Sequence, residues 1–156
     1  MDDDFGDDRD EAEGTGAPGH PDFSAHFTDP MYDDPGDEFA PFGSDEGADD
    51  LTEWSERLDE LDDSTTVRFL LEDGFDDPTD VDGFITELTD EDESVDAAVI
   101  TVGAGFTLLR LTGHIDEEGR ALVLTALGRL QAFYGEQSQF TRMRADLEAF
   151  GSRMQR

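Results

Sequence analysis

The chain has 156 residues, enough for one domain of ordinary size, and no cysteine, which excludes disulfide bonds, thiol catalysis and Cys-ligated zinc. It has 42 acidic residues, ten arginines and no lysine, so its net charge is −32. This charge argues against nucleic-acid binding by the whole surface, because phosphates would be repelled. The N-terminal stretch is acidic and no apolar run approaches the length of a membrane span. We therefore expect no secretory signal, no membrane insertion and a cytoplasmic location.

Two explanations of the acidity stay open. In the first, all proteins of the source organism are acidic, because carboxylates keep a protein hydrated in concentrated salt. Repulsion between the carboxylates is screened there, since the Debye length falls to roughly 3 Å near 1 M. In the second, the acids recognise a partner in an ordinary cytoplasm. Acidic residues continue through the apparently folded part, at 59–63 and 90–93, and this favours the first, halophilic, explanation.

Residues 1–50 are predicted to form a disordered acidic arm. They hold 18 of the 42 acids and one arginine, and they are poor in aliphatic residues. Such a segment cannot offset a chain entropy of about 1–2 kcal/mol per residue. Its spaced aromatics include Phe23, Phe39 and Phe42, which lie in two acid-flanked phrases typical of docking motifs for a protein partner. The alternative is a solubilising tail with incidental aromatics.

Residues 51–156 are predicted to form a single domain that begins with a helix near residue 50. An apolar stripe of helical spacing runs from Leu51 to Leu61. The segment 65–71, rich in β-branched and aromatic residues, predicts a strand. Thr79 is a suitable N-cap for a short helix that follows.

The segment 95–102 predicts the clearest strand in the chain, apolar enough to be central in a sheet. Glycines at 103 and 105 are typical of a turn, and they lead into a second apolar segment at 106–112. Together the two segments predict a β-hairpin.

The next helix is predicted to start after Asp116 and to continue through about Tyr134, with Phe133 on its core face. A break near Gly135 leads to a last helix at about 138–155. The order of elements favours an α+β fold, with a small three-stranded, largely antiparallel sheet packed by helices and preceded by the disordered arm.

The last helix carries the strongest functional lead. Its apolar residues follow a spacing of alternately three and four, which keeps them on one narrow stripe flanked by arginines. Aromatic, methionine and arginine side chains are enriched at interface cores. The stripe either packs on the chain's own sheet or meets a partner's helix, including that of a second copy in a homodimer. The stripe consists of Phe140, Met143, Leu147, Phe150 and Met154, and the flanking arginines are Arg142, Arg144, Arg153 and Arg156.

No motif predicts catalytic, cofactor-binding or metal-ligating residues. The three histidines do not converge in sequence, and two of them lie in the predicted arm. An EF-hand loop centred on Gly83 fails at its first and last ligand positions. The glycines at 103 and 105 lack the third glycine and the following helix of a dinucleotide fingerprint.

These observations favour a non-enzymatic cytoplasmic adaptor, chaperone-like protein or regulatory protein-binding module from a salt-adapted proteome. The alternative is a regulator that contacts nucleic acid through its Arg-bearing C-terminal helix. A pocket holding two carboxylates of raised pKa would instead indicate an enzyme.

Overall fold

The computed structural model describes residues 20–34, 36–37, 39–43, 45–62, 64–73, 75–77, 79–88 and 95–154. Within these ranges the regular structure is entirely helical and contains no strand. The predicted α+β fold with a three-stranded sheet is therefore wrong, and the fold is all-α. The helices are α1 (Pro21–His26), η2 (Pro30–Asp33), α2 (Asp45–Ser55), η3 (Leu58–Glu60), α3 (Val67–Asp73), α4 (Asp80–Glu87), α5 (Asp96–Thr112), α6 (Glu117–Tyr134) and α7 (Ser138–Met154).

Helix α5 replaces the predicted β-hairpin. It runs for 17 residues without a break, and every residue from 101 to 110 is buried. A helix that is apolar on all sides belongs in the interior, and its short apolar runs cannot be told from buried strands by periodicity. The predicted strands at 95–102 and 106–112 are the two halves of this one helix.

The glycines between those halves do not form a turn; they allow neighbouring helices to approach α5 closely. A Cβ atom on Gly103 would lie 2.8 Å from the Cα of Gly47 in α2. A Cβ atom on Gly105 would overlap the Cγ2 of Val123 in α6. Because two helices press on the same stretch of α5, only the smallest residue fits at each crossing.

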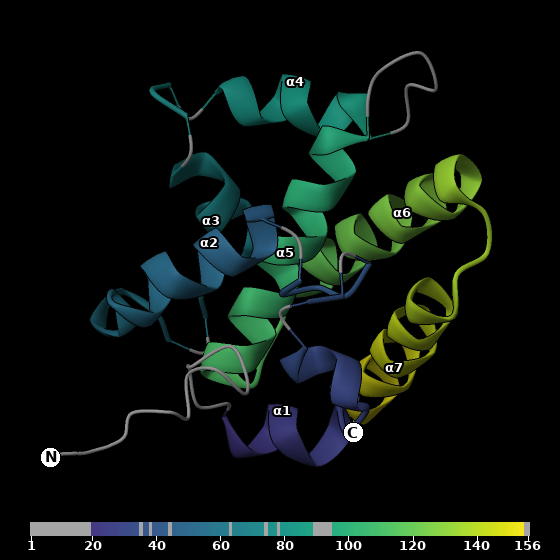
Figure 1. The fold of residues 1–156 in the computed structure, drawn as a ribbon. Coiled ribbons are helices and arrows are strands. Elements are labelled where there is room, and N and C mark those ends of the chain that lie inside the picture. The colour runs from purple at the N-terminus through teal and green to yellow at the C-terminus, as the bar shows by residue number, and fades with distance from the viewer. Residues whose placement is uncertain are drawn as a thin grey trace, which may run out of the picture.

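The other helices are arranged around α5. It contacts α1, α2, α3, α4 and α6, while α7 packs on α6. In Figure 1, α2 and α3 lie on one side of α5, α6 and α7 lie on the other, and α4 and α1 lie near its two ends. The core is thus built from helices on helices, with α5 in the middle.

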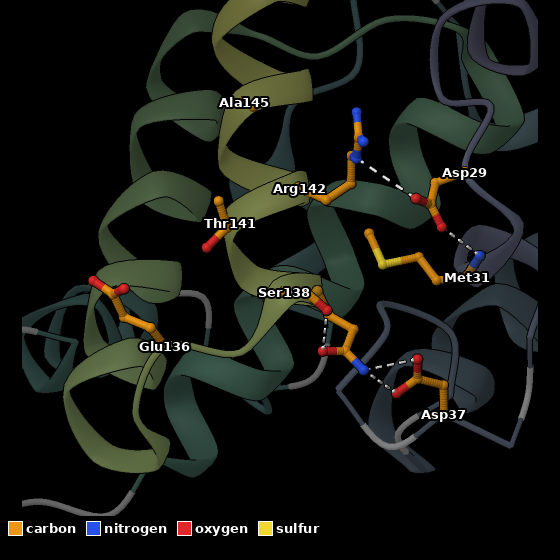
Figure 2. A pocket seen from close by; sticks show the side chains of 9 residues that line it. Asp29, Met31, Asp37, Glu136, Ser138, Thr141, Arg142 and Ala145 are labelled. Atoms are coloured by element: carbon orange, nitrogen blue, oxygen red, sulfur yellow. Dashed lines mark hydrogen bonds and ion pairs between the residues drawn. The ribbon is translucent and has the colours of Figure 1, made fainter.

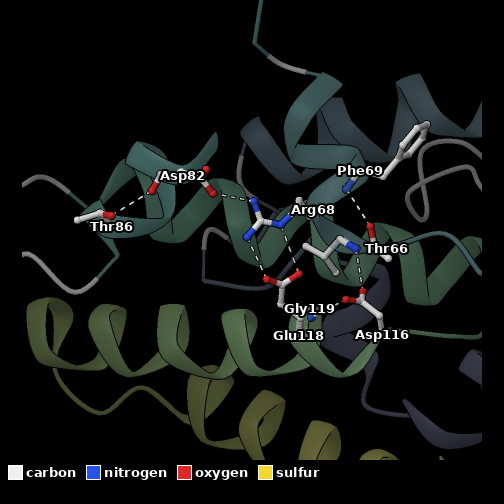
Figure 3. A network of polar contacts seen from close by, with 9 residues as sticks. Thr66, Arg68, Phe69, Asp82, Thr86, Asp116, Glu118 and Gly119 are labelled. Carbon is white, nitrogen blue, oxygen red and sulfur yellow. Dashed lines mark hydrogen bonds and ion pairs between the residues drawn. The ribbon is translucent and has the colours of Figure 1, made fainter. Parts of the chain in front are cut away.

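The predicted strand at 65–71 is also helical, because α3 begins at Val67. Its first amide is satisfied from another element: the Val67 N–H donates to Asp116 Oδ1 at 2.8 Å, while Asp116 Oδ2 accepts from Gly119 N–H at 2.8 Å. One carboxylate therefore caps both α3 and α6 (Figure 3). The predicted N-cap at Asp116 is confirmed, and α6 ends before Gly135 as expected.

Arg68 ties three helices together next to this double cap (Figure 3). From α3 its guanidinium donates to Asp82 of α4 at 2.9 Å and to Glu118 of α6 at 3.0 Å. These bonds, chiefly the one to Glu118, raise the pKa of Arg68. In a chain without lysine, single arginines link several carboxylates, which lowers the repulsion between acidic helices.

The described residues between 20 and 43 pack on the helical body. The His20 N–H donates to the Arg110 carbonyl of α5 at 2.7 Å, and Phe23, Phe27 and Tyr32 are each at most 3% exposed. Aromatic rings bury more area per residue than any aliphatic side chain, so a few of them suffice to anchor this segment. The described residues before position 50 thus share a core with the helices that follow, while the predicted division at residue 50 stays a prediction. Residues 1–19 lie outside the described residues.

The close packing at α5 predicts opposite outcomes for two glycine substitutions. Gly105→Ala is expected to lower the free energy of unfolding by roughly 1–3 kcal/mol, because the added methyl overlaps the Val123 side chain. Gly83→Ala, on α4 with nothing within 4 Å of the new carbon, is expected to raise it by up to about 1 kcal/mol. Urea unfolding of the two variants measures both effects. A Gly105→Ala protein as stable as the Gly83→Ala protein would contradict the packing of α6 on α5.

Candidate functional site

The apolar stripe of α7 lies against the chain's own core. Phe140, Met143, Leu147 and Phe150 are each at most 4% exposed. The Phe150 ring lies 5.5 Å from that of Phe27, so the N-terminal aromatics provide part of the cover. The sequence left open whether this stripe packs internally or meets a partner, and four of its five residues pack internally. The fifth, Met154, has a side chain outside the described part.

The arginines that flank the stripe also contact the chain itself. Arg142 forms ion pairs with Asp29, at 3.5 Å, and with Asp146, at 3.8 Å. Arg144 donates to the Leu124 carbonyl of α6 at 3.3 Å. Nothing is described of the side chain of Arg153 or of Arg156.

The three aromatics of the predicted docking motifs have two different environments. Phe23 and Phe42 are fully buried, at 3% and 0% exposure, and the guanidinium of Arg110 lies over both rings, 5.8 Å and 5.3 Å from their centres. Phe39 is only partly buried and packs against the core from outside. Of the three, Phe39 alone reaches the surface.

A groove of about 750 Å³ runs along the first half of α7 (Figure 2). One wall comes from the segment that contains η2 and the turn after it, and the other side comes from α7 and the loop before it. We call it the acidic groove. It is lined by Asp29, Met31, Asp37, Glu136, Ser138, Gln139, Thr141, Arg142 and Ala145.

The η2 wall is fastened to α7 by polar contacts at Asp146. The Tyr32 hydroxyl donates to Asp146 Oδ2 at 2.7 Å, and His26 Nε2 lies 2.8 Å from the Asp146 carbonyl oxygen. Burial and the neighbouring carboxylate raise the pKa of Tyr32, so its hydroxyl keeps its proton and remains a donor. The wall is therefore held by side chains that come from both ends of the chain.

The carboxylates of the groove differ in how their charge is compensated. Asp29 is paired with Arg142. Asp37 accepts from neutral donors, the Gln139 amide at 3.0 Å and the Phe39 N–H at 3.1 Å. Glu136 is exposed and forms no hydrogen bond or ion pair within the described part of the chain. Two negative charges of the groove thus lack a cationic partner there.

Beside the groove lies a group of aromatic rings, which we call the aromatic corner: Phe39, Phe133, Tyr134 and Phe140. Tyr134 packs on Phe39, with 5.3 Å between ring centres, and on Phe133, with 4.8 Å. Phe133 is 60% exposed and Tyr134 is 42% exposed. The sequence placed Phe133 on the core face of its helix, and this was wrong, because Phe133 lies in the last turn of α6 and its side chain is mostly exposed. Solvent exposure at a helix end leaves no signal in the spacing.

The described residues form neither a metal site nor a membrane-spanning helix. No group of three or more His, Asp or Glu side chains is placed to hold a metal ion. Among these residues, no helix has the length and apolar character needed to cross a membrane.

One curated protein matches the chain at significant similarity. It is the uncharacterized protein YfeS of Escherichia coli strain K12, which is 34% identical over 122 residues. The match covers 72% of this chain and 50% of YfeS, so the chain spans about half the length of the curated relative it matches. No family model and no solved structure matches the chain. The comparison establishes relatedness and carries no activity with it.

The contact between Tyr32 and Asp146 predicts how the groove wall responds to alkali. Because the pKa of folded Tyr32 is raised above the ordinary value near 10, the unfolded chain loses this proton first as the pH rises. The stability that the tyrosine contributes is complete below about pH 10, and above that pH it falls by about 1.4 kcal/mol per pH unit.

Tyr32→Phe is expected to lower the free energy of unfolding by roughly 1–3 kcal/mol near neutral pH and to remove this alkaline slope. The matched variant Tyr134→Phe, at the surface, is expected to change the stability by less than about 0.5 kcal/mol. Chemical unfolding at pH values from 7 to about 11 measures both. An unchanged alkaline slope in Tyr32→Phe would show that the buried hydroxyl does not hold the wall.

Proposed function

We propose that this protein is a cytoplasmic protein-binding module without a catalytic site of its own, acting as an adaptor or chaperone-like regulator. Its partner binds at the aromatic corner and extends into the acidic groove. The helical body serves to hold this surface in one shape.

The exposure of Phe133 and Tyr134 is the observation that carries the proposal. Single exposed apolar residues are common, but here the exposed Phe133 ring packs on Tyr134, and the exposed Tyr134 ring packs in turn on Phe39, which gives an apolar surface of several rings. Aromatic side chains are enriched at interface cores and among the residues that dominate binding energy. The surface lies at the rim of a groove that is itself large enough to take several side chains.

Hydrogen bonds within the loops that carry the rings and the groove also support a binding role. Phe39 donates its N–H to Asp37 of the groove, and the Tyr134 carbonyl accepts from the Gln137 side chain, next to Glu136. The rings and the groove are therefore held by the same loops. A surface that is already shaped loses little conformational entropy when a partner binds.

The nucleic-acid alternative has less support from the described residues. Arg142 is engaged with two carboxylates, and Arg144 donates to a backbone carbonyl oxygen. A phosphate approaching α7 would have to displace these contacts against the repulsion of a chain of net charge −32.

Partner capture with matched variants tests the proposal. Phe133→Ser removes the most exposed ring of the aromatic corner, while Phe69→Ser removes an exposed aromatic residue (42% exposed) on α3, away from the site. Quantitative mass spectrometry of proteins retained by the full chain from its source lysate is expected to show a stoichiometric partner. The Phe133→Ser protein should retain it roughly 30-fold less, as for an interface residue worth about 2 kcal/mol, and the Phe69→Ser protein should retain it unchanged. Equal losses in both variants, or no stoichiometric partner for the wild type, would refute the proposal.

A further inference from the structure

We infer that the segment bound at this site carries arginine or lysine together with apolar residues: its cation enters the acidic groove and its apolar part lies on the aromatic corner. This inference rests on the proposed function and specifies the chemistry of the partner. The occupant is a basic amphipathic segment of another protein.

The first argument is the charge of the groove. Asp29, Asp37 and Glu136 contribute three carboxylates, and Arg142 contributes one guanidinium that is already paired with Asp29 and Asp146. Asp37 and Glu136 have no cationic partner among the described residues, so they retain their attraction for an incoming cation. A negatively charged cleft with low-dielectric walls concentrates field lines and favours positively charged groups.

The second argument is the aromatic rim. Arginine and lysine side chains have long aliphatic stems below a charged head, and an aromatic face binds both parts, by apolar contact and by cation–π attraction. Phe133 and Tyr134 lie with their rings nearly perpendicular, at 82°, so they present both faces and edges to a partner. A purely apolar segment would leave the neighbouring carboxylates desolvated and unpaired, whereas a basic amphipathic one pairs them.

The third argument is that the chain already binds one of its own arginines in this way. The guanidinium carbon of Arg57 lies 4.0 Å from the centre of the Trp54 ring. Around the ring, Glu53, Glu60 and Asp73 accept hydrogen bonds from Arg57 at 2.6–3.1 Å. These bonds raise the pKa of Arg57, chiefly through Glu60 and then Asp73.

At the aromatic corner, exposed rings and a carboxylate lie close together along the chain, and the described residues place no arginine on those rings. Glu136 follows the exposed pair Phe133 and Tyr134 by two residues and has no cation beside it. A partner's arginine or lysine could therefore bind there as Arg57 binds beside Trp54, with an aromatic ring on one side and carboxylates as acceptors.

Peptide titration tests the inference on the full chain. The probe is a fluorescent 12-residue peptide of alternating arginine and leucine, compared with one in which citrulline replaces arginine and with one in which glutamate does. Citrulline keeps the shape of arginine and removes its charge. Fluorescence anisotropy in about 0.1 M KCl is expected to show binding of the arginine peptide, at least about tenfold weaker binding of the citrulline peptide, and none of the glutamate peptide.

Two charge-reversal variants locate the binding. Glu136→Lys and Glu87→Lys change the net charge equally at exposed positions, but Glu87 lies on α4, away from the groove. The first is expected to weaken binding of the arginine peptide about tenfold and the second by less than about twofold. Phe133→Ser is expected to weaken it as well. Thermal unfolding of each variant checks that the fold is retained.

The outcomes separate this inference from the proposed function. Equal binding of the arginine and citrulline peptides, equal losses in the two Lys variants, or no binding of the arginine peptide would overturn the inference. If a cellular partner still depends on Phe133 in that case, the protein-binding function stands and the partner is not basic. If neither peptide binding nor partner capture depends on Phe133, both proposals fail.

Discussion

The burial of α5 is the constraint on which the rest of the structure depends. Its ten consecutive buried residues must be covered from every direction, and five other helices share that task. The glycines at 103 and 105 set how closely α2 and α6 approach. Helix α6 is fixed there, and its last turn carries the exposed rings of Phe133 and Tyr134. Helix α7 packs on α6 with its apolar stripe buried. The position of the candidate site thus follows from packing around one helix.

The N-terminal aromatic segment completes the arrangement. It covers one side of α5. The His20 N–H donates to the α5 backbone, and the guanidinium of Arg110 lies over the rings of Phe23 and Phe42. It also brings Tyr32 to Asp146 of α7, which creates the groove wall. The aromatic residues of this segment are buried or partly buried in the core, and the residues between them, Asp29, Met31 and Asp37, line the groove opposite α7.

A structural feature could be predicted from the sequence where it depends on residues that are close together in the chain. Asp116, the break at Gly135 and the alternating spacing of α7 are local signals, and the structure agrees with them. The segments at 65–71 and 95–112 were misread as strands because β-branched residues and an unbroken apolar run are shared by strands and buried helices. The packing of the described residues between 20 and 43 leaves little signal in the composition, because apolar residues are few there although each buried ring covers a large area. The exposure of Phe133 depends on where a helix ends relative to its neighbours, which spacing does not encode.

The N-terminal aromatic segment (residues 20–34, 36–37 and 39–43) packs into the helical body and forms one wall of the groove. Native-state hydrogen exchange, read at single amides by NMR, tests this packing most directly. The amide of His20, which donates to the Arg110 carbonyl, and that of Phe27, which donates to the Phe23 carbonyl, are the decisive positions. The account predicts that both are protected as strongly as the amides of α7. Exchange of these two amides at the rate of an unstructured peptide, while α5 and α6 remain protected, would contradict it.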